Sequence, residues 1–166
     1  ITAIGITRLG GNTIVFGCGD YTVKGREQYV KCEDEYHLCK NFIQYWQDNC
    51  PDVVTGWNTK FFDIPYLVNR LSNLLGDSEA KKLSPWNFVN ERKGNFNGRE
   101  ITEYDIVGVG ALDYIELYKW YAPGGKSQES YSLDNIASVE LGEKKLDYSE
   151  YENLHRSEEH TSEFQS

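Results

Sequence analysis

Short apolar segments separated by turn residues open the chain. Ile1–Arg8 and Thr13–Cys18 are rich in Ile, Val and Thr, and Gly10-Gly11-Asn12 lies between them. β-Branched residues on both sides of a glycine-rich turn predict a β-hairpin. After a polar connection, Gln28–Lys31 is expected to form a short extended segment.

The pattern then changes to a helical period. Apolar residues recur three and four positions apart in Glu33–Cys50, and Pro51 ends this helix. Asp52–Trp57 is a short apolar strand, and Asp63–Leu75 is again helical. A strand between two helices indicates an α/β layer. The apolar stripe of the second helix is predicted to comprise Tyr66, Leu67, Arg70, Leu71, Leu74 and Leu75.

A polar hairpin and a strand are predicted in the second half of the chain. Asn87–Glu103 is strongly polar and contains Asn97-Gly98, a dipeptide that favours tight hairpin turns. Tyr104–Leu112 has strand character with several small residues, which suggests that another segment packs closely on it. Further helices are predicted over Ser78–Leu83, Asp113–Tyr121 and Ser132–Val139, the last with Ser132 as its N-cap.

These elements predict an α/β fold in which helices pack on one mixed, twisted sheet. The 166 residues suffice for one domain with its own core, and no apolar run approaches the ~20 residues that span a bilayer. Four cysteines without a CxxC pair and three histidines argue against a zinc site and a disulfide framework. The net charge of −9 argues against a nucleic-acid coat protein, but it allows an enzyme that holds metal ions with carboxylates.

The last residues do not fit this pattern. Residues 156–166, RSEEHTSEFQS, show no periodicity and no apolar face. They are similar to the in-frame translation of a sequencing-adapter oligonucleotide, although an ordinary polar tail would have the same composition. We therefore predict a domain over residues 1–155 and a non-native tail over 156–166.

Candidate chemistry is densest in Thr55–Tyr66, where a strand ends and a helix begins. Asp63 at this junction could ligate a hard cation, and Phe61 and Phe62 could stack on unpaired bases. A structural interpretation is also open: Asp63 is a helix N-cap and both phenylalanines belong to the core. The two interpretations of Asp63 are compatible, because a cap position also holds the carboxylate in place.

Other charged residues carry weaker signals. Asp105 and Asp113 flank the small-residue strand and resemble a carboxylate pair, but we expect Asp113 to cap the next helix and Asp105 to be exposed. Lys81-Lys82 is expected on a solvated face, and His37 on the surface of its helix.

The spacing of Asn58, Phe62 and Asp63, N-x3-F-D after Thr-Gly-Trp, resembles the second exonuclease motif of family B DNA polymerases. The run TGWNTKFFDIPYLVNRL is similar to the version in large tailed bacteriophages. Leu112–Pro123 and Ser130–Tyr148 resemble two later blocks of the same family. Three ordered blocks are far more specific than one short motif, and the resemblance covers nearly all of residues 1–155.

The resemblance implies a ribonuclease-H-like 3′–5′ exonuclease (proofreading) domain of a DNA-directed DNA polymerase, with a β-hairpin inserted near Asn87–Glu103. Such a domain removes mismatched 3′-terminal nucleotides with two Mg²⁺ (or Mn²⁺) ions held by four carboxylates. Asp63 matches a catalytic metal ligand, and Asn58 and Phe62 match positions that contact single-stranded DNA. Arg92-Lys93 on the hairpin is the further DNA-binding candidate, because basic residues there would meet phosphates.

The resemblance also implies a domain truncated at both ends. The family's first motif, D-x-E, would precede Ile1, and its third, Y-x3-D, would follow His155. With one of four carboxylates, the chain by itself is expected to be inactive. Without the strand that would precede Ile1, it is expected to be marginally stable or to aggregate, because backbone groups of the sheet are left unpaired. The alternatives are a free-standing exonuclease of the same fold and a non-catalytic DNA-binding or structural module.

The implied partners are the single-stranded 3′ primer end of DNA, the remainder of the polymerase chain and a sliding clamp, with no membrane. The implied location is the cytoplasm of an infected bacterial host.

Overall fold

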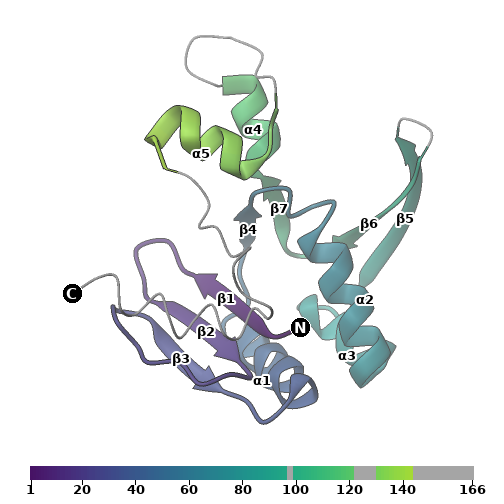
Figure 1. Ribbon diagram of the computed structural model, residues 1–166. Helices are drawn as coiled ribbons and strands as arrows, with labels where there is room; N and C mark the ends of the chain where they lie inside the picture. The colour runs from purple at the N-terminus through teal and green to yellow at the C-terminus, as the bar shows by residue number, and fades with distance from the viewer. Residues whose placement is uncertain (97–98, 122–129, 144–166) are drawn as a thin grey trace. The chain divides into compact units, whose positions relative to one another are not determined.

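A computed structural model describes residues 1–96, 99–121 and 130–143, and the side chains of 95–100 are outside the description. The chain forms two compact units, residues 1–122 and 123–166 (Figure 1). The described part of the second unit contains one helix, α5 (Leu133–Leu141). The elements of the first unit, in chain order, are β1 (Ala3–Thr7), β2 (Thr13–Gly17), β3 (Gln28–Lys31), α1 (Glu35–Asp48), β4 (Val53–Gly56), α2 (Asp63–Leu75), α3 (Asp77–Ala80), the 3₁₀ turn η1 (Lys81–Leu83), β5 (Val89–Phe96), β6 (Arg99–Ile106), β7 (Gly110–Asp113) and α4 (Tyr114–Tyr121).

The predicted N-terminal hairpin and extended segment form a three-stranded sheet. β1 pairs antiparallel with β2, with Ile6 opposite Ile14, and β3 pairs parallel with the other edge of β2. Alternate residues of β2, Ile14 and Phe16, are buried, as expected for a strand with one covered face. The ring of Phe16 meets that of Phe42 on α1 edge-on, which places α1 on this face of the sheet.

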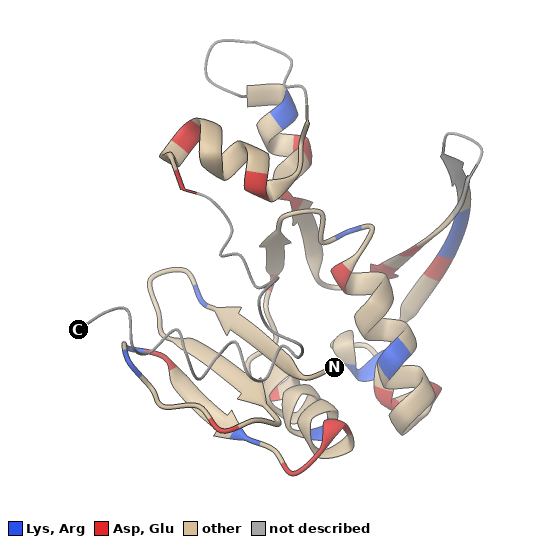
Figure 2. Ribbon diagram, in the orientation of Figure 1, with Lys and Arg blue, Asp and Glu red and all other residues tan. Residues whose placement is uncertain are grey.

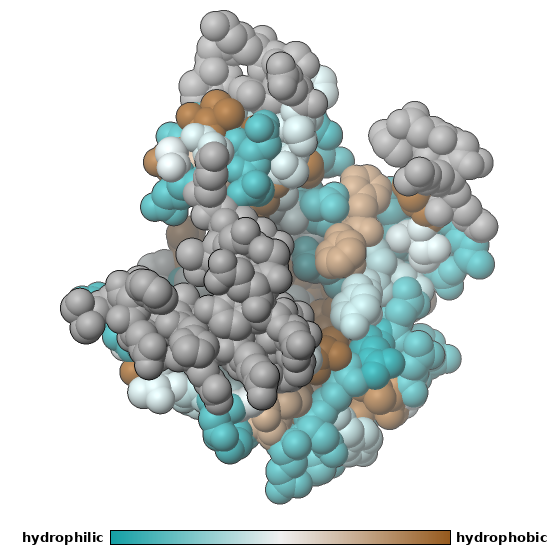
Figure 3. All heavy atoms as spheres, in the orientation of Figure 1, coloured by the Kyte–Doolittle hydropathy of each residue, from teal (hydrophilic) through white to brown (hydrophobic). Residues whose placement is uncertain are grey.

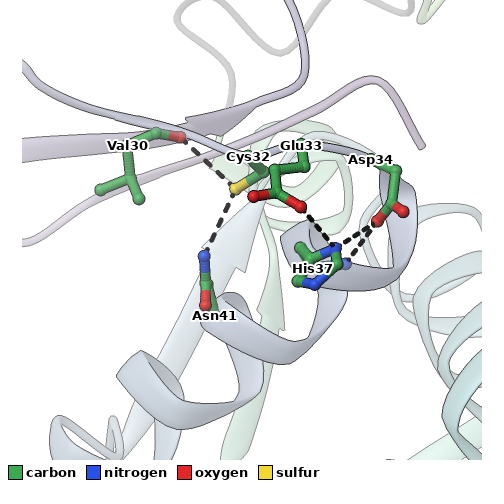
Figure 4. Close-up of polar contacts among 6 residues, drawn as sticks. All are labelled: Val30, Cys32, Glu33, Asp34, His37 and Asn41. Atoms are coloured by element: carbon green, nitrogen blue, oxygen red, sulfur yellow. Dashed lines mark hydrogen bonds and ion pairs between the residues drawn. The ribbon is translucent and has the colours of Figure 1, made fainter.

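The start of α1 is set by a side chain. Asp34 has extended backbone (φ −154°, ψ 179°), and its Oδ1 accepts the backbone N–H of His37 at 2.9 Å (Figure 4). An N-cap aspartate satisfies donors that the first helical turn leaves unpaired. The helix therefore begins at Glu35, two residues later than the apolar period predicted. His37 is exposed beside Glu33 and Asp34, which confirms its predicted surface position.

The hydrophobic core lies between α1, α2, β2 and η1. Trp46 of α1 donates its indole N–H to the Leu83 carbonyl at 2.7 Å, so a polar group within the core is satisfied. Cys32 and Cys39 are buried here as small apolar side chains, and all four cysteines are free, as predicted. The members with less than a tenth of their surface exposed include Ile14, Phe16, Leu38, Cys39, Phe42, Ile43, Trp46, Ile64, Val68, Leu71 and Leu83.

The predicted bounds of α2 are confirmed, and its predicted apolar stripe is confirmed in part: Leu71 is buried, and Leu67, Leu74 and Leu75 pack against the core. The buried residues are Ile64, Pro65, Val68 and Leu71, whereas Tyr66 is exposed. Ile64, Val68 and Leu71 follow the i, i+4, i+7 spacing of one helix face, so the buried face includes Ile64 and Val68, which the prediction omitted. Arg70 reaches the carboxylate of Glu35 on α1, with Nε–Oε1 at 2.6 Å.

The predicted strand Tyr104–Leu112 is broken by a turn. β6 ends at Ile106, the N–H of Val109 donates to the Ile106 carbonyl at 3.0 Å, and Gly108 has φ +94°. A positive φ at the third position of a turn is typical of glycine. The small residues here therefore form a turn between β6 and β7, where the pattern predicted one strand.

The strands form three separate sheets instead of one mixed sheet. β4 pairs parallel with β7, and β5 pairs antiparallel with β6 as the predicted hairpin. Alternation along a strand identifies the strand and its buried face, but it does not identify the partner. The hairpin tip at 97–98 lies outside the described residues, as do residues 156–166.

The two later helices are confirmed with small shifts. α4 begins after Asp113 and has no buried residue. Trp120 and Tyr121 near its end are largely exposed. In the second unit, Ser132 caps α5 by accepting the N–H of Asn135 at 3.3 Å. No helix within the described ranges is long and apolar enough to cross a membrane.

Candidate active site

The N-x3-F-D motif occupies the loop between β4 and α2. Gly56 closes β4, and a Cβ at this position would lie 2.1 Å from Oγ1 of Thr59, so only glycine fits here without a shift. Asn58 follows with φ +62°, a conformation that asparagine adopts more readily than most residues. Its carbonyl accepts the N–H of Phe62 at 3.0 Å, which turns the chain into α2.

Asp113 holds this loop from the neighbouring strand. It ends β7 opposite Gly56, is only 4% exposed, and accepts three backbone N–H bonds. Its Oδ1 accepts from Asn58 at 2.9 Å and from Ile115 at 3.1 Å, and its Oδ2 accepts from Lys60 at 3.0 Å. Charge-assisted bonds to backbone donors are among the strong hydrogen bonds in proteins. The bond to Ile115 confirms the predicted helix cap, but the sequence pattern did not indicate the bonds to the loop.

The loop is also packed from one side by aromatic rings. Trp57 lies 6.1 Å from the ring of Tyr114 and 5.7 Å from that of Tyr118, both on α4. Tilted ring pairs at these separations are favourable arrangements. Trp57, the residue before the motif, therefore packs against α4, and Asp113 holds the backbone of the motif through hydrogen bonds.

Asp63 is the first residue of α2, and its side chain does not cap the helix. The N-cap residue is Phe62, and no side-chain cap hydrogen bond is present, so the interpretation of Asp63 as an N-cap is wrong. The surrounding protein raises the pKa of the Asp63 carboxyl by desolvation, and the charge of Asp113 raises it further, against one bond from its own backbone N–H. Asp63 as a whole is nevertheless an exposed residue, and a cation beside its carboxylate would relieve the repulsion from Asp113.

The two phenylalanines of the motif are exposed. Phe61 is 39% and Phe62 65% exposed, so the interpretation that both belong to the core is wrong. The Lys60 ammonium lies 5.2 Å from the centre of the Phe61 ring, within cation–π distance. The ring of Phe62 is parallel to that of Tyr66, one turn further along α2. Asn58, Phe62 and Asp63 therefore gather at one exposed junction.

The hairpin residues Arg92 and Lys93 lie on β5, where Arg92 is opposite Glu103 of β6. Arg92 pairs with Asp105 across the hairpin at 3.2 Å, and Lys93 pairs with Glu91 at 3.5 Å. Figure 2 shows both signs of charge along the two arms. Asp105 is exposed on β6, as predicted, and it does not pair with the buried Asp113. Lys81 is exposed as predicted, whereas Lys82 is half-buried and forms an ion pair with Glu79 at 2.6 Å.

Within the described residues, no group of three or more His, Cys, Asp or Glu side chains is arranged to hold a metal ion. Carboxylate oxygens suit hard cations such as Mg²⁺, which need several oxygen ligands. Asp63 has the right chemistry for one such ligand. The second nearby carboxylate, Asp113, is already occupied by backbone donors.

Comparison with known proteins identifies the family. Residues 16–136 match the family model described as DNA polymerase family B, exonuclease domain. This match covers most of the chain, including the loop between β4 and α2 and the helices α1, α2 and α4. The chain therefore belongs to the family B DNA polymerase exonuclease domains.

Individual relatives agree with this assignment. The chain is 39% identical over 122 residues to the DNA-directed DNA polymerase of Escherichia phage RB69, and 34% identical over 122 residues to that of Enterobacteria phage T4. Each alignment covers 72% of this chain and 13% of the relative. A DNA polymerase catalytic subunit of Saimiriine herpesvirus 2 is 29% identical over 121 residues, covering 69% of this chain and 12% of the relative. The chain thus corresponds to about an eighth of these viral polymerases.

Proposed function

We propose that this chain is part of the 3′–5′ exonuclease domain of a viral DNA-directed DNA polymerase, which removes mismatched 3′-terminal nucleotides. The supporting observation is the junction of β4 and α2. There the family's motif places Asp63, whose carboxylate does not cap α2, next to Phe62, whose ring is exposed. The length of the relatives favours a polymerase over a free-standing exonuclease, because each is several times longer than this chain.

The proposed complete fold is ribonuclease-H-like, with both ends of the domain outside this chain. The mixed three-stranded sheet covered by α1 and the inserted β5–β6 hairpin support this proposal. Residues 1–155 are proposed to be a part of this domain, followed by the non-native tail 156–166.

Asp63 is proposed to be a metal ligand and catalytic residue. Its exposed oxygens suit Mg²⁺ or Mn²⁺, and the like charge of Asp113 favours a cation beside it. Two such ions, when bound, activate a water and stabilise the leaving oxygen of the terminal phosphodiester. One carboxylate cannot hold two ions, and the D-x-E and Y-x3-D motifs implied by the resemblance would supply the others. The chain by itself is therefore proposed to be inactive.

The remaining motif residues are proposed to hold the DNA strand. Phe62 would stack on an unpaired base at the 3′ end, and Asn58, kept in place through its backbone by Asp113, would contact the same strand. Arg92 and Lys93 would contact phosphates from β5, in exchange for their present carboxylate partners. The further proposed partners are the rest of the polymerase and a sliding clamp, in the cytoplasm of an infected bacterial host.

A chimaeric polymerase tests this function. The matched 122-residue segment of the phage RB69 polymerase is replaced by the corresponding segment of this chain. We expect Mg²⁺-dependent release of nucleotides from the 3′ end of single-stranded DNA. Asp63→Ala should lower this rate by several orders of magnitude and leave polymerisation intact.

The matched control is Asp48→Ala, which removes an exposed carboxylate from α1 and should leave both activities unchanged. The unfused 166-residue chain should not cleave the same DNA. Exonuclease activity of the Asp63→Ala chimaera equal to that of the unaltered chimaera would contradict the proposal. Loss of polymerisation in the same variant would instead indicate misfolding.

A further inference from the structure

Two aromatic rings lie parallel on the exposed side of α2. Phe62 and Tyr66 are four residues apart, and the N–H of Tyr66 donates to the Phe62 carbonyl at 3.0 Å, so the side chains are neighbours on one helix face. Their ring centres are 6.4 Å apart, and their planes differ by only 6°. Phe62 is 65% exposed and Tyr66 53%.

Packing does not account for the position of Tyr66. α2 buries Ile64, Val68 and Leu71 on its other face, and Tyr66 is not part of the hydrophobic core. Its hydroxyl forms no hydrogen bond within the described part of the chain, whereas that of Tyr104 donates to Asn69 at 2.7 Å. Tyr66 is thus exposed and outside the core, and its ring is stacked on that of Phe62. Figure 3 shows hydrophobic surface on the viewed face of the molecule, next to hydrophilic surface.

We propose that Tyr66 is a second base-stacking residue, one helical turn from Phe62, so that this face of α2 accepts two successive unpaired nucleotides. This inference rests on the proposed function, which assigns strand contact to Phe62 and none to Tyr66. Parallel rings can each accept one of two bases whose own planes are parallel. Stacking on aromatic rings is tolerant of sequence, because every base has a π-face. Such tolerance suits a site that must accept any terminal nucleotide.

The Tyr66 ring, and not its hydroxyl, is expected to make the contact. Tyr66→Phe should therefore bind single-stranded DNA within twofold of the unaltered chain, and Tyr66→Trp at least as tightly. Tyr66→Ala should weaken binding roughly 5- to 100-fold, which corresponds to the loss of one stacked base. Because Tyr66 is exposed, these changes should leave folding intact.

Fluorescence anisotropy of a labelled oligothymidylate with the purified 166-residue chain at low salt measures this binding. Tyr36→Ala, which removes another exposed tyrosine from α1, is the matched control and should not change binding. A second oligonucleotide with abasic sugars at its last two 3′ positions separates stacking from other effects. The unaltered chain and Tyr66→Ala should bind this probe equally weakly.

The outcomes distinguish this inference from the proposed function. If Phe62→Ala weakens binding and Tyr66→Ala does not, the inference is overturned while the proposed function stands. Equal weakening by Tyr66→Phe and Tyr66→Ala would assign the effect to the hydroxyl and also overturn it. If neither Phe62→Ala nor Tyr66→Ala changes binding, or if the unaltered chain binds no DNA, the strand contact itself is absent and both proposals fail.

Discussion

The Lys60 ammonium lies 3.5 Å from the carboxylate of Glu103, and this ion pair joins the motif loop to strand β6 of the hairpin. The next residue of β6, Tyr104, donates its hydroxyl to Asn69 on α2. Two consecutive residues of the hairpin thus contact the two segments that flank Asp63. The hairpin and the candidate active site are therefore connected by side chains as well as by the chain itself.

The Lys60–Glu103 pair should contribute little to the free energy of unfolding, because both side chains are partly exposed. A double-mutant cycle of Lys60→Met and Glu103→Gln, measured by urea unfolding, should give a coupling energy of about 0.2–1 kcal/mol. The coupling should nearly vanish in 1 M NaCl, where charges are strongly screened. A coupling that survives the salt would show that something other than charge attraction joins the two residues.

Asp113→Ala should be among the most destabilising substitutions in the loop region. It removes the acceptor of three backbone N–H groups, and we expect a loss of about 2–4 kcal/mol in the free energy of unfolding. Asp113→Asn should cost less than Asp113→Ala, because its amide oxygen can keep the two bonds that Oδ1 accepts. The bond from Lys60 is lost, and the amide NH2 then faces the Lys60 N–H, donor against donor.

Chemical denaturation of these two variants beside Asp105→Ala checks the ranking. Replacing the exposed Asp105 should cost less than about 1 kcal/mol, because its side chain forms a surface ion pair with Arg92. Equal losses for Asp113→Ala and Asp105→Ala would show that the bonds to the loop are not stabilising.

Gly108→Ala should also destabilise the protein, by about 2–4 kcal/mol. Gly108 has φ +94°, and a Cβ there would lie 2.7 Å from Cγ of Pro85. The control is Gly5→Ala on β1, where the added Cβ would be 3.8 Å from its nearest neighbour, Cγ2 of Val15. Thermal unfolding should show a clear drop in Tm for Gly108→Ala and little change for Gly5→Ala. The reverse order would contradict the turn conformation assigned to Gly108.

The pH dependence of stability should contain a contribution from Glu35. The Arg70 guanidinium holds the pKa of this carboxyl at about 2, below its ordinary 4.5; burial opposes this effect, and the Ile1 ammonium adds to it. Because the folded pKa is the lower one, the stabilisation is complete above pH 4.5 and is lost as the pH falls from about 4.5 to about 2. Its size should be about 2 kcal/mol, since solvent partly screens the pair.

Unfolding free energies of the unaltered chain and Glu35→Gln, compared between pH 7 and pH 3, measure this contribution. The difference between the two proteins should shrink as the pH falls. Glu116→Gln on the exposed face of α4 is the control and should keep a constant difference. A difference for Glu35→Gln that does not change with pH would show that the pair with Arg70 does not stabilise the fold.

The local features of this protein were predictable from its sequence. The first hairpin follows from Gly10-Gly11-Asn12, the bounds of α2 from Pro65 and Gly76, and the start of α5 from the Ser132 cap. In each case the deciding residues lie within a few positions of the element that they define, and their backbone preferences act over the same range. The N-x3-F-D motif could be identified from the sequence for the same reason, because Asn58, Phe62 and Asp63 lie within six consecutive positions.

The tertiary structure decided what depends on distant neighbours. Asp113 is 55 positions from Asn58, and only the pairing of β4 with β7 brings its carboxylate to the loop. Tertiary packing also left Tyr66 and Phe62 in solvent, and it placed the turn at Gly108 beside Pro85. A hydrogen bond or a covered face between remote segments leaves no periodic pattern in either segment, so the sequence alone could name the motif but not the residues that hold it.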